Sequence, residues 1–303
     1  LGTAAWRPFT DGDDEYREFA QRQRGDRPAF GGGGHGFYLP FNWRGFYDFG
    51  SSLIGDWAVH ILGPANWGLQ LSPQSLLSVE CIKKDSLPPF TFPSELTLKY
   101  EFAARGGMPP VTVYWYQTAE SEAYLPPGMA VEDARKIPGA GPDLRAGANR
   151  RRPPSATSES PEAAARRRAS ARRYGAGYNC IFVGSKGFMG TDGRGEDVGL
   201  LPGTRWAEYE LPRASLTRAP GARTDSNHVA HCNDWVRACK GGAPACSHFG
   251  VAGPFTEWLV LGVAAVHYEG KLLWDAEKGE ITNIPEANQW VKPTYRKGWE
   301  IRL

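Results

Sequence analysis

Three short runs of sequence decide the fold: SLLSVECIKK (residues 75–84), ELTLKYEFAA (95–104) and VTVYWYQ (111–117). Each is rich in β-branched and aromatic residues, and turns that contain proline or glycine separate them. In the second run, apolar side chains alternate with others over 96–102, the period-2 pattern of a sheet with one buried face. These runs predict three neighbouring strands, with the Arg-Gly-Gly-Met-Pro-Pro segment at 105–110 as the turn between the last two.

Two hairpins and three helices are predicted around these strands. NCIFVGSKGFMGTD (179–192) has two β-rich runs on either side of Gly-Ser-Lys-Gly, and KLLWDAEKGEITN (271–283) has the same form. Capping, glycine and proline signals predict helices at 52–62, which Gly63-Pro64 would end, at 228–240, and at 254–268 with Pro254 at its start. Helices and hairpins in this order predict an α+β fold rather than a series of β-α-β units.

The composition excludes several protein classes. The chain has 303 residues, of which 41% are hydrophobic and 22% charged, values that exclude a wholly disordered or a collagen-like chain. No run of 18 apolar residues is present, so no transmembrane helix and no membrane partner are expected. Five widely spaced cysteines are not typical of a secreted disulfide framework. The chain begins at Leu1 and shows no leader pattern, so we expect that an upstream segment has been removed or that the chain is a piece of a longer polypeptide.

The basic residues are concentrated in one segment. Residues 118–177 show no periodic pattern of apolar residues. Residues 139–177 contain nine arginines and only three carboxylates. We interpret 118–177 as a loop that contains an arginine-rich, disordered insertion in a domain at 37–303, and 1–36 as an N-terminal arm or linker. The rest of the chain is mildly acidic, so no nucleic-acid partner is expected.

Asp56 and His60 are the strongest candidates for chemistry. They are four residues apart in the predicted helix 52–62 and would share one face, where a carboxylate can orient an imidazole for acid/base work. A histidine that is merely hydrogen-bonded at a helix surface is the alternative interpretation. Aromatic and charged residues bracket the pair and are the candidate substrate-binding residues: Trp43, Arg44, Tyr47, Asp48 and Trp67.

Other signals are weak. GGGGHG at 31–36 does not follow a strand or open a helix, so no nucleotide-binding loop is predicted. His228, His231, Cys232, Cys239, Cys246 and His248 are zinc-capable in type, but their spacing matches no closed zinc pattern, and no metal site is expected. Lys186 at a hairpin tip is expected to be solvated.

Five stretches resemble one family. FNWRGFYDFGSSLIGDWAVHILGPANWGL is similar to the start of the C-terminal domain of the Gfo/Idh/MocA oxidoreductases, in the bacterial branch with an extended C-terminal domain. YEFAARGGMPPVTVYWY, IFVGSKGFM, DWVRACKGGAPACSHFGVAGPFTEWLVLGVAAV and LLWDAEKGEITNIPEANQWVKPTYRKGWEI fit the same branch, in order, from about residue 37 to 301.

The resemblance implies both fold and function. The fold would be an open, mostly antiparallel β-sheet with helices packed on one face and no Rossmann domain in this chain. The chain would be the substrate-binding and catalytic half of an NAD(P)-dependent oxidoreductase of a sugar, cyclitol or related polyol, with His60 and Asp56 as the proton-transfer pair. NAD or NADP is implied by the family alone, and its nucleotide domain would lie upstream or on another chain, since the family's Glu-Lys-Pro motif is absent here.

Two other functions stay open. One is a non-redox carbohydrate-binding or oligomeric scaffold domain without nucleotide binding, and the other is lyase-like acid/base chemistry on a keto-sugar. The expected partners are a sugar or polyol and further copies of the chain, bound through the open sheet face. The family would place the protein in the bacterial cytoplasm or periplasm, and the sequence does not choose between them.

Overall fold

The computed structural model describes these residues of the chain: 42–117, 125–130, 133–134, 178–193, 195, 197–213 and 227–300. The chain divides into two compact units. Unit 1 comprises 1–58, 73–117 and 258–303, and unit 2 comprises 59–72 and 118–257. The predicted arm at 1–36 and the whole of the predicted arginine-rich stretch at 139–177 lie outside the described residues.

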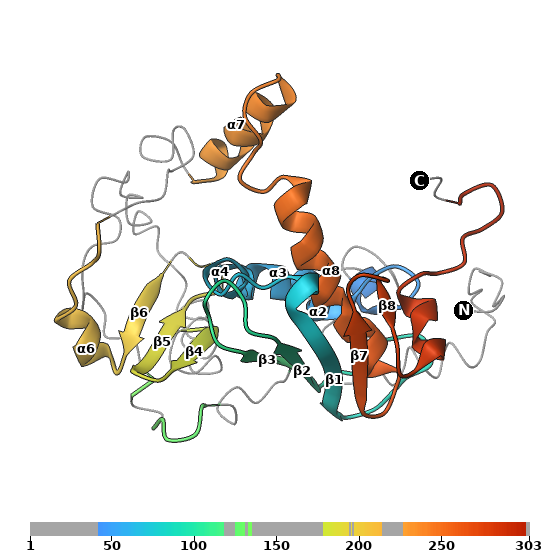
Figure 1. Ribbon diagram of the computed structural model, residues 1–303, viewed down its shortest axis with the longest axis horizontal. Coiled ribbons are helices and arrows are strands. Elements are labelled where there is room, and N and C mark those ends of the chain that lie inside the picture. The colour runs from blue at the N-terminus through green and yellow to red at the C-terminus, as the bar shows by residue number, and fades with distance from the viewer. Residues whose placement is uncertain are drawn as a thin grey trace, which may run out of the picture. The chain divides into compact units, whose positions relative to one another are not determined.

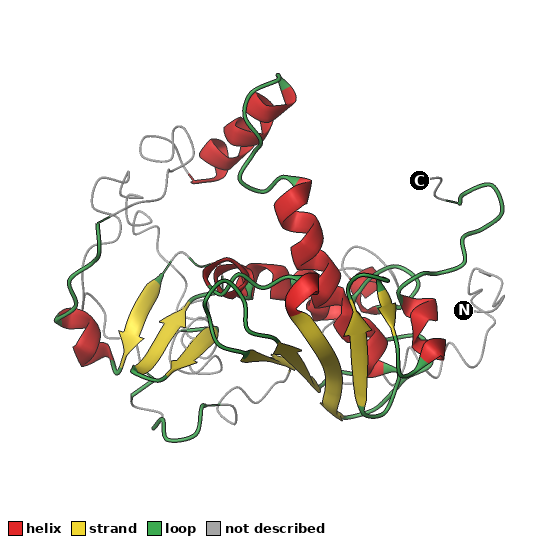
Figure 2. Cartoon of the chain, viewed as in Figure 1, coloured by secondary structure: helices red, strands yellow, loops and turns green. Residues whose placement is uncertain are grey.

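Unit 1 is built on a five-stranded sheet whose strand order is β3-β2-β1-β7-β8 (Figure 1; Figure 2). All of its pairings are antiparallel. The strands are β1 (Leu76–Lys84), β2 (Leu96–Phe102), β3 (Val111–Gln117), β7 (Lys271–Asp275) and β8 (Glu280–Ile281). The predictions of three central strands, of a final hairpin and of an α+β fold with an open antiparallel sheet are confirmed.

A two-glycine turn joins β2 to β3. Gly106 and Gly107 both have positive φ angles, which L side chains rarely adopt, and Arg105 pairs with Met108 across the turn. This turn holds the two strands in a register that places Tyr100 opposite Val113. The backbone conformation of this turn therefore explains why both positions are glycine.

One helix, α8 (Phe249–Val266), covers the buried face of this sheet with its C-terminal half. The Trp258 ring makes edge contacts with the Tyr100 ring at 5.3 Å and with the Phe102 ring at 5.2 Å. The Tyr100 hydroxyl donates a hydrogen bond of 2.8 Å to the carbonyl of Leu259. Tyr100, Trp258 and Leu259 are completely buried, so this contact is the centre of the core of unit 1.

The start of α8 differs from the prediction. Pro254 was expected to begin the helix, but it lies inside the helix, which starts five residues earlier. The reason is His248, whose carbonyl accepts a hydrogen bond from the Val251 N–H and whose Nδ1 accepts one of 3.1 Å from the Gly250 N–H. With these donors satisfied, the proline lacks one hydrogen bond near the start of an otherwise continuous helix.

Helix α8 is also long and apolar enough, by length and composition alone, to cross a membrane, and it is the only such helix among the residues described. This is weak evidence, because the core helix of a globular domain passes the same test. The burial of its C-terminal half against β2 accounts for its apolar sequence.

Unit 2 contains a three-stranded antiparallel sheet in the order β4-β5-β6. Its strands are β4 (Cys180–Gly184), β5 (Gly187–Thr191) and β6 (Val198–Leu201), and α6 (Gly203–Ala207) follows. Gly190 and Gly199 are paired across β5 and β6, and the Tyr178 side chain lies so close to both that a Cβ at either position would collide with it. The predicted hairpin at 179–192 is confirmed.

Part of the predicted loop at 118–177 packs on this small sheet. Met129 and Ala134 are buried in one apolar cluster with Tyr178 and Leu201. The described residues of that loop therefore contribute to a core.

The helices outside α8 are short except for one. They are η1 (Asn42–Gly45), α2 (Ser52–Asp56), α3 (Ala58–Ile61), α4 (Gly63–Gly68), η2 (Pro73–Ser75), α7 (Asn227–Cys239) and η4 (Pro285–Trp290). The prediction of a helix ending near 240 before two glycines is confirmed by α7.

The prediction of one helix over 52–62 is wrong. Trp57 is a turn residue between α2 and α3, and Gly63-Pro64 begins α4 instead of ending a helix. Proline is accepted in the first turn of a helix because its missing N–H would have no partner there. The pattern of apolar residues could not distinguish a proline that ends one helix from a proline that starts the next.

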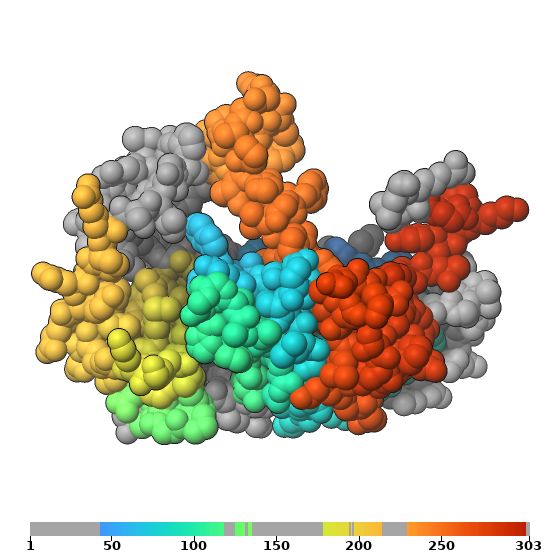
Figure 3. All heavy atoms as spheres, viewed as in Figure 1, coloured from blue at the N-terminus to red at the C-terminus, as the bar shows by residue number. Residues whose placement is uncertain are grey.

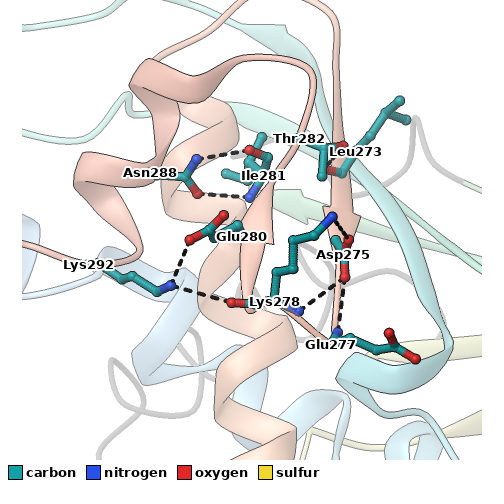
Figure 4. A network of polar contacts seen from close by, with 9 residues as sticks. All are labelled: Leu273, Asp275, Glu277, Lys278, Glu280, Ile281, Thr282, Asn288 and Lys292. Atoms are coloured by element: carbon teal, nitrogen blue, oxygen red, sulfur yellow. Dashed lines mark hydrogen bonds and ion pairs between the residues drawn. The ribbon is translucent and has the colours of Figure 1, made fainter.

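The edge of the sheet at β8 is closed by side chains. Asn288 on η4 accepts a hydrogen bond from the Ile281 N–H and donates one to the Ile281 carbonyl, both of 2.8 Å, as a neighbouring strand would (Figure 4). On the same hairpin, Asp275 accepts hydrogen bonds from the N–H groups of Glu277 and Lys278 and stabilises the turn. Figure 3 shows the atoms of β7 (red-orange) packed against those of β1 (cyan), which agrees with their pairing.

Gly262→Ala will destabilise unit 1, because a Cβ at this position would overlap the Tyr100 hydroxyl and lie 2.5 Å from Leu98 Cδ1. We expect a loss of about 1–3 kcal/mol in the free energy of unfolding, measured by urea denaturation. Gly253→Ala is the matched control in the same helix, where no atom lies within 4 Å of the added Cβ. There the better helix propensity of alanine should stabilise by about 0.5–1 kcal/mol. Equal effects of the two changes would contradict the packing argument.

Asn288→Ala will leave the N–H and the carbonyl of the buried Ile281 without these partners. We expect a loss of about 2–3 kcal/mol, measured by thermal and urea unfolding. The control is Lys278→Ala, which removes an exposed ion pair with Asp275 and should leave the free energy of unfolding almost unchanged. A cost for Asn288→Ala as small as that of the control would show that Asn288 does not support the edge.

Candidate functional site

The segment that carries most of the predicted site residues is fixed to unit 1 by backbone hydrogen bonds. The Tyr47 N–H donates to the Phe90 carbonyl at 3.1 Å, and the Phe92 N–H donates to the Gly45 carbonyl at 3.0 Å. Phe46 forms the β-bridge between these two bonds with Thr91. The position of Arg44 and its neighbours is therefore set by the loop between β1 and β2.

A tight bend brings Arg44 back to α2. The Gly50 N–H donates to the Phe46 carbonyl at 2.9 Å, and a Cβ at Gly50 would lie only 2.6 Å from the Arg44 carbonyl oxygen. No larger residue fits at 50 without moving this backbone. The bend places Arg44 Nε 3.3 Å from Asp56 Oδ2 at the end of α2.

Trp43, Arg44 and Asp56 form one group of side chains at the surface of unit 1, which we call the Arg44–Asp56 site. The Arg44 guanidinium lies 4.6 Å from the centroid of the Trp43 ring, in a cation–π contact. About a third of the Arg44 and Asp56 side chains is exposed, so a solute can reach them. The site offers an anchored carboxylate that accepts hydrogen bonds from hydroxyl groups, beside a flat aromatic ring.

Tyr47 lies in an aromatic cluster next to this segment. Its ring centroid is 4.5 Å from that of Phe92, 4.6 Å from that of His267 and 5.8 Å from that of Trp290. The His267 ring stacks on the Trp290 ring at 3.7 Å, with 10° between their planes. Burial raises the pKa of the Tyr47 hydroxyl well above its usual value, so the phenol stays protonated. Tyr47 thus packs within the aromatic cluster of unit 1.

His267 follows the last residue of α8 and is held neutral. Burial, and secondarily the charge of Lys84, lower its pKa from 6.5 to about 4. Lys84 donates a hydrogen bond of 2.9 Å to the carbonyl of Val266 at the helix C-terminus and pairs with Glu269 at 3.3 Å. Within the described residues, His267 Nε2 and the Tyr47 hydroxyl are buried atoms without a hydrogen-bond partner. A neutral imidazole is the form that such surroundings tolerate.

The sequence did not indicate the residues that hold Tyr47. Phe92, His267 and Trp290 come from three distant parts of the chain and meet only in the folded unit. The single available signal was the histidine directly after a long apolar helix. A signal of that kind does not identify a partner.

The other predicted residues lie elsewhere. Asp48 is exposed in the turn after Tyr47. His60 is an exposed residue of α3, and Trp67, on α4, is 71% exposed; both belong to unit 2. The structure thus brings Trp43, Arg44 and Asp56 together within unit 1, and the predicted common helix face for Asp56 and His60 is not formed by one helix, since Trp57 interrupts it.

Two further features of the described residues bear on where a ligand could bind. An open hollow at the β2–β3 turn is lined by residues 104–109, but its one charged side chain, Arg105, donates hydrogen bonds to the carbonyls of Ala103 and Pro109. In the described part of the chain, no group of three histidine, cysteine or acidic side chains is placed to hold a metal ion. The side chain of His228 lies outside the described residues.

Comparison with known proteins adds no identification. The sequence matches no protein-family model, and no curated protein is significantly similar to it. Function therefore has to be argued from the residues themselves.

Replacing His267 by phenylalanine will remove a pH dependence of stability. Because the pKa of His267 is lower in the folded chain than in the unfolded one, unfolding takes up a proton between pH 6.5 and about 4. The folded wild type should therefore lose about 1–2 kcal/mol relative to His267→Phe as the pH falls through this window, a value reduced for partial exposure of the ring. Urea unfolding of both proteins at pH 7, 6, 5 and 4 measures the difference.

The comparison is its own control, because all other titrating groups are common to both proteins and cancel. Phenylalanine also keeps a ring that can stack on Trp290. A difference in unfolding free energy that stays constant from pH 7 to pH 4 would contradict the assignment of a buried neutral His267.

Proposed function

We propose that this chain is the substrate-binding and catalytic half of an NAD(P)-dependent oxidoreductase that acts on a sugar, cyclitol or related polyol. His60 and Asp56 are the proton-transfer pair in this proposal. Its family is the one that the sequence resembles, the Gfo/Idh/MocA oxidoreductases, and the open antiparallel sheet with α8 on one face is compatible with their C-terminal domain.

The Arg44–Asp56 site is the observation that supports the proposal best. Polyols are recognised by carboxylates that accept hydrogen bonds from hydroxyl groups and by aromatic rings that meet the C–H face of the sugar. Asp56 and Trp43 provide both within one short segment, and Arg44 contacts each of them. The ion pair with Arg44 fixes the direction of the Asp56 carboxylate, whose oxygens accept hydrogen bonds.

His60 is the residue proposed to move the proton. Its imidazole is exposed, as a group that exchanges protons with a bound hydroxyl must be. Oxidation of a secondary alcohol releases one proton from the hydroxyl, and the histidine would accept it. The residues of this sequence do not fit a nicotinamide nucleotide, since no glycine-rich loop follows a strand and opens a helix. The nucleotide would be held by residues outside the printed sequence.

The outer face of the five-stranded sheet is proposed to bind further copies of the chain. Glu101 at its centre accepts hydrogen bonds from Lys271, Lys99 and Ser78, and these contacts lower the pKa of its carboxyl to about 2. The exposed, stacked rings of Tyr114 and Tyr116 lie on β3 next to this network. A flat surface of aromatic rings and already paired charges is a suitable oligomer interface.

The deciding experiment is a product analysis. The polypeptide as its gene encodes it is incubated with a panel of sugars, cyclitols and keto-sugars, with and without NAD or NADP, and the products are identified by mass spectrometry. We expect a product that lacks two hydrogens, formed only with a nicotinamide, and a rate reduced by about 10²–10⁴ in His60→Gln. A product that lacks one water and needs no nicotinamide would mean lyase chemistry instead.

Binding is measured separately, by calorimetry on the 303-residue chain. Trp43→Ala and Asp56→Asn should each weaken polyol binding by about tenfold, whereas His60→Gln should leave it nearly unchanged. Trp299→Ala is the matched control, an exposed tryptophan of unit 1 outside the site. Sugar binding without any product from the native polypeptide would support a carbohydrate-binding module, and equal losses in Trp43→Ala and Trp299→Ala would contradict the assignment of the site.

A further inference from the structure

In the Arg44–Asp56 site, one side chain contacts two groups of different chemistry. The Arg44 guanidinium lies over the Trp43 ring, 4.6 Å from its centroid, and Arg44 Nε lies 3.3 Å from Asp56 Oδ2. A planar guanidinium can make both contacts at once, because its flat face stacks on an aromatic ring while the N–H groups at its edge point to a carboxylate. Trp43 and Asp56 are thus linked through Arg44.

The backbone of Arg44 is held in place independently of these contacts. The carbonyl of the next residue, Gly45, accepts a hydrogen bond of 3.0 Å from the Phe92 N–H. On the other side, a Cβ at Gly50 would lie 2.8 Å from Arg44 Cα, so the bend packs directly on this residue. Arg44 Nε is shielded from solvent, although 29% of the whole side chain is exposed. The guanidinium therefore reaches the surface from a fixed origin, with a buried donor atom next to Asp56.

Stability alone is a weak reason for this arrangement. About a third of the Arg44 and Asp56 side chains is exposed, and ion pairs at such sites contribute little to the free energy of unfolding. The two contacts do restrict where the Trp43 ring and the carboxylate can lie. Groups that are already in place lose less conformational freedom when a ligand binds, so a restriction of this kind favours binding.

We propose that Arg44 is a positioning residue: it holds the Trp43 ring and the Asp56 carboxylate in one arrangement, so that the two act on a bound solute as a single unit. The inference rests on the proposed function only for the nature of that solute, a polyol. Because the guanidinium covers one face of the Trp43 ring, a sugar ring would stack on the other face.

The first test needs no ligand. It follows the indole N–H signal of Trp43 in nuclear magnetic resonance spectra of the 303-residue chain, assigned among the eleven tryptophans by its loss in Trp43→Phe. We expect Asp56→Asn to move this signal in the wild-type background and to have no further effect once Arg44 is replaced by methionine. Arg44→Lys should behave like Arg44→Met, because lysine keeps the charge but has no planar group to stack on the ring.

The matched control is Arg296→Met. Arg296 also lies over a tryptophan ring in unit 1, that of Trp299 at 5.0 Å. This change should move the Trp299 signal and leave the Trp43 signal where it is. Circular dichroism checks that each variant is folded.

The second test is polyol binding, measured by calorimetry with myo-inositol and sorbitol as probes. Arg44→Met and Arg44→Lys should each weaken binding by about tenfold, and adding Asp56→Asn or Trp43→Ala to Arg44→Met should weaken it little further. Arg296→Met should leave the affinity unchanged.

The outcomes separate the two proposals. A Trp43 signal that ignores Asp56→Asn, or that moves equally with and without Arg44, would overturn the positioning role. Full rescue by Arg44→Lys, or losses of affinity that simply add, would also overturn it. If the Trp43 signal responds to Asp56 only through Arg44 and neither probe binds the wild-type chain, the positioning role stands and the proposed polyol function is contradicted.

Discussion

The close approach of α8 to β2 is the contact on which unit 1 depends. It needs Gly262, because a side chain there would occupy the place of the Tyr100 hydroxyl and the Leu98 methyl group. At that distance the hydroxyl of the completely buried Tyr100 reaches the Leu259 carbonyl, and Trp258 contacts two rings of β2. A polar group is thereby satisfied at the centre of an apolar core, where an unsatisfied one would be costly.

The same helix positions the surroundings of the candidate site. Because α8 ends where Lys84 of β1 binds its last carbonyl, His267 emerges at a fixed point beside Tyr47. Trp290, from η4 after β8, stacks on the His267 ring. The backbone around Tyr47 in turn carries Arg44 toward Asp56. Helix α8 therefore connects the core contact at Gly262 with the aromatic cluster around Tyr47.

The fold could be predicted from the sequence where the signal is local. Alternation over 96–102, the two glycines at 106–107 and the glycine-flanked hairpins are properties of a few neighbouring residues, and the strands they predict are present. The predictions of one helix over 52–62 and of a helix start at Pro254 were wrong, since a proline near a helix end is compatible with stopping the helix or with starting it. Trp43, Arg44 and Asp56 could be named because they lie close together in sequence, whereas Phe92, His267 and Trp290 could not.

The chemistry of Asp56 is constrained by its partner. The Arg44 guanidinium, 3.3 Å from Asp56 Oδ2, fixes the direction of this carboxylate, so its oxygens are placed to accept hydrogen bonds from the hydroxyl groups of a bound solute. In the proposed alcohol oxidation a second group has to take up the hydroxyl proton, and His60 is the residue proposed for that step. The ion pair with Arg44 thus favours an orienting role for Asp56, and in the proposed mechanism proton exchange is left to the histidine.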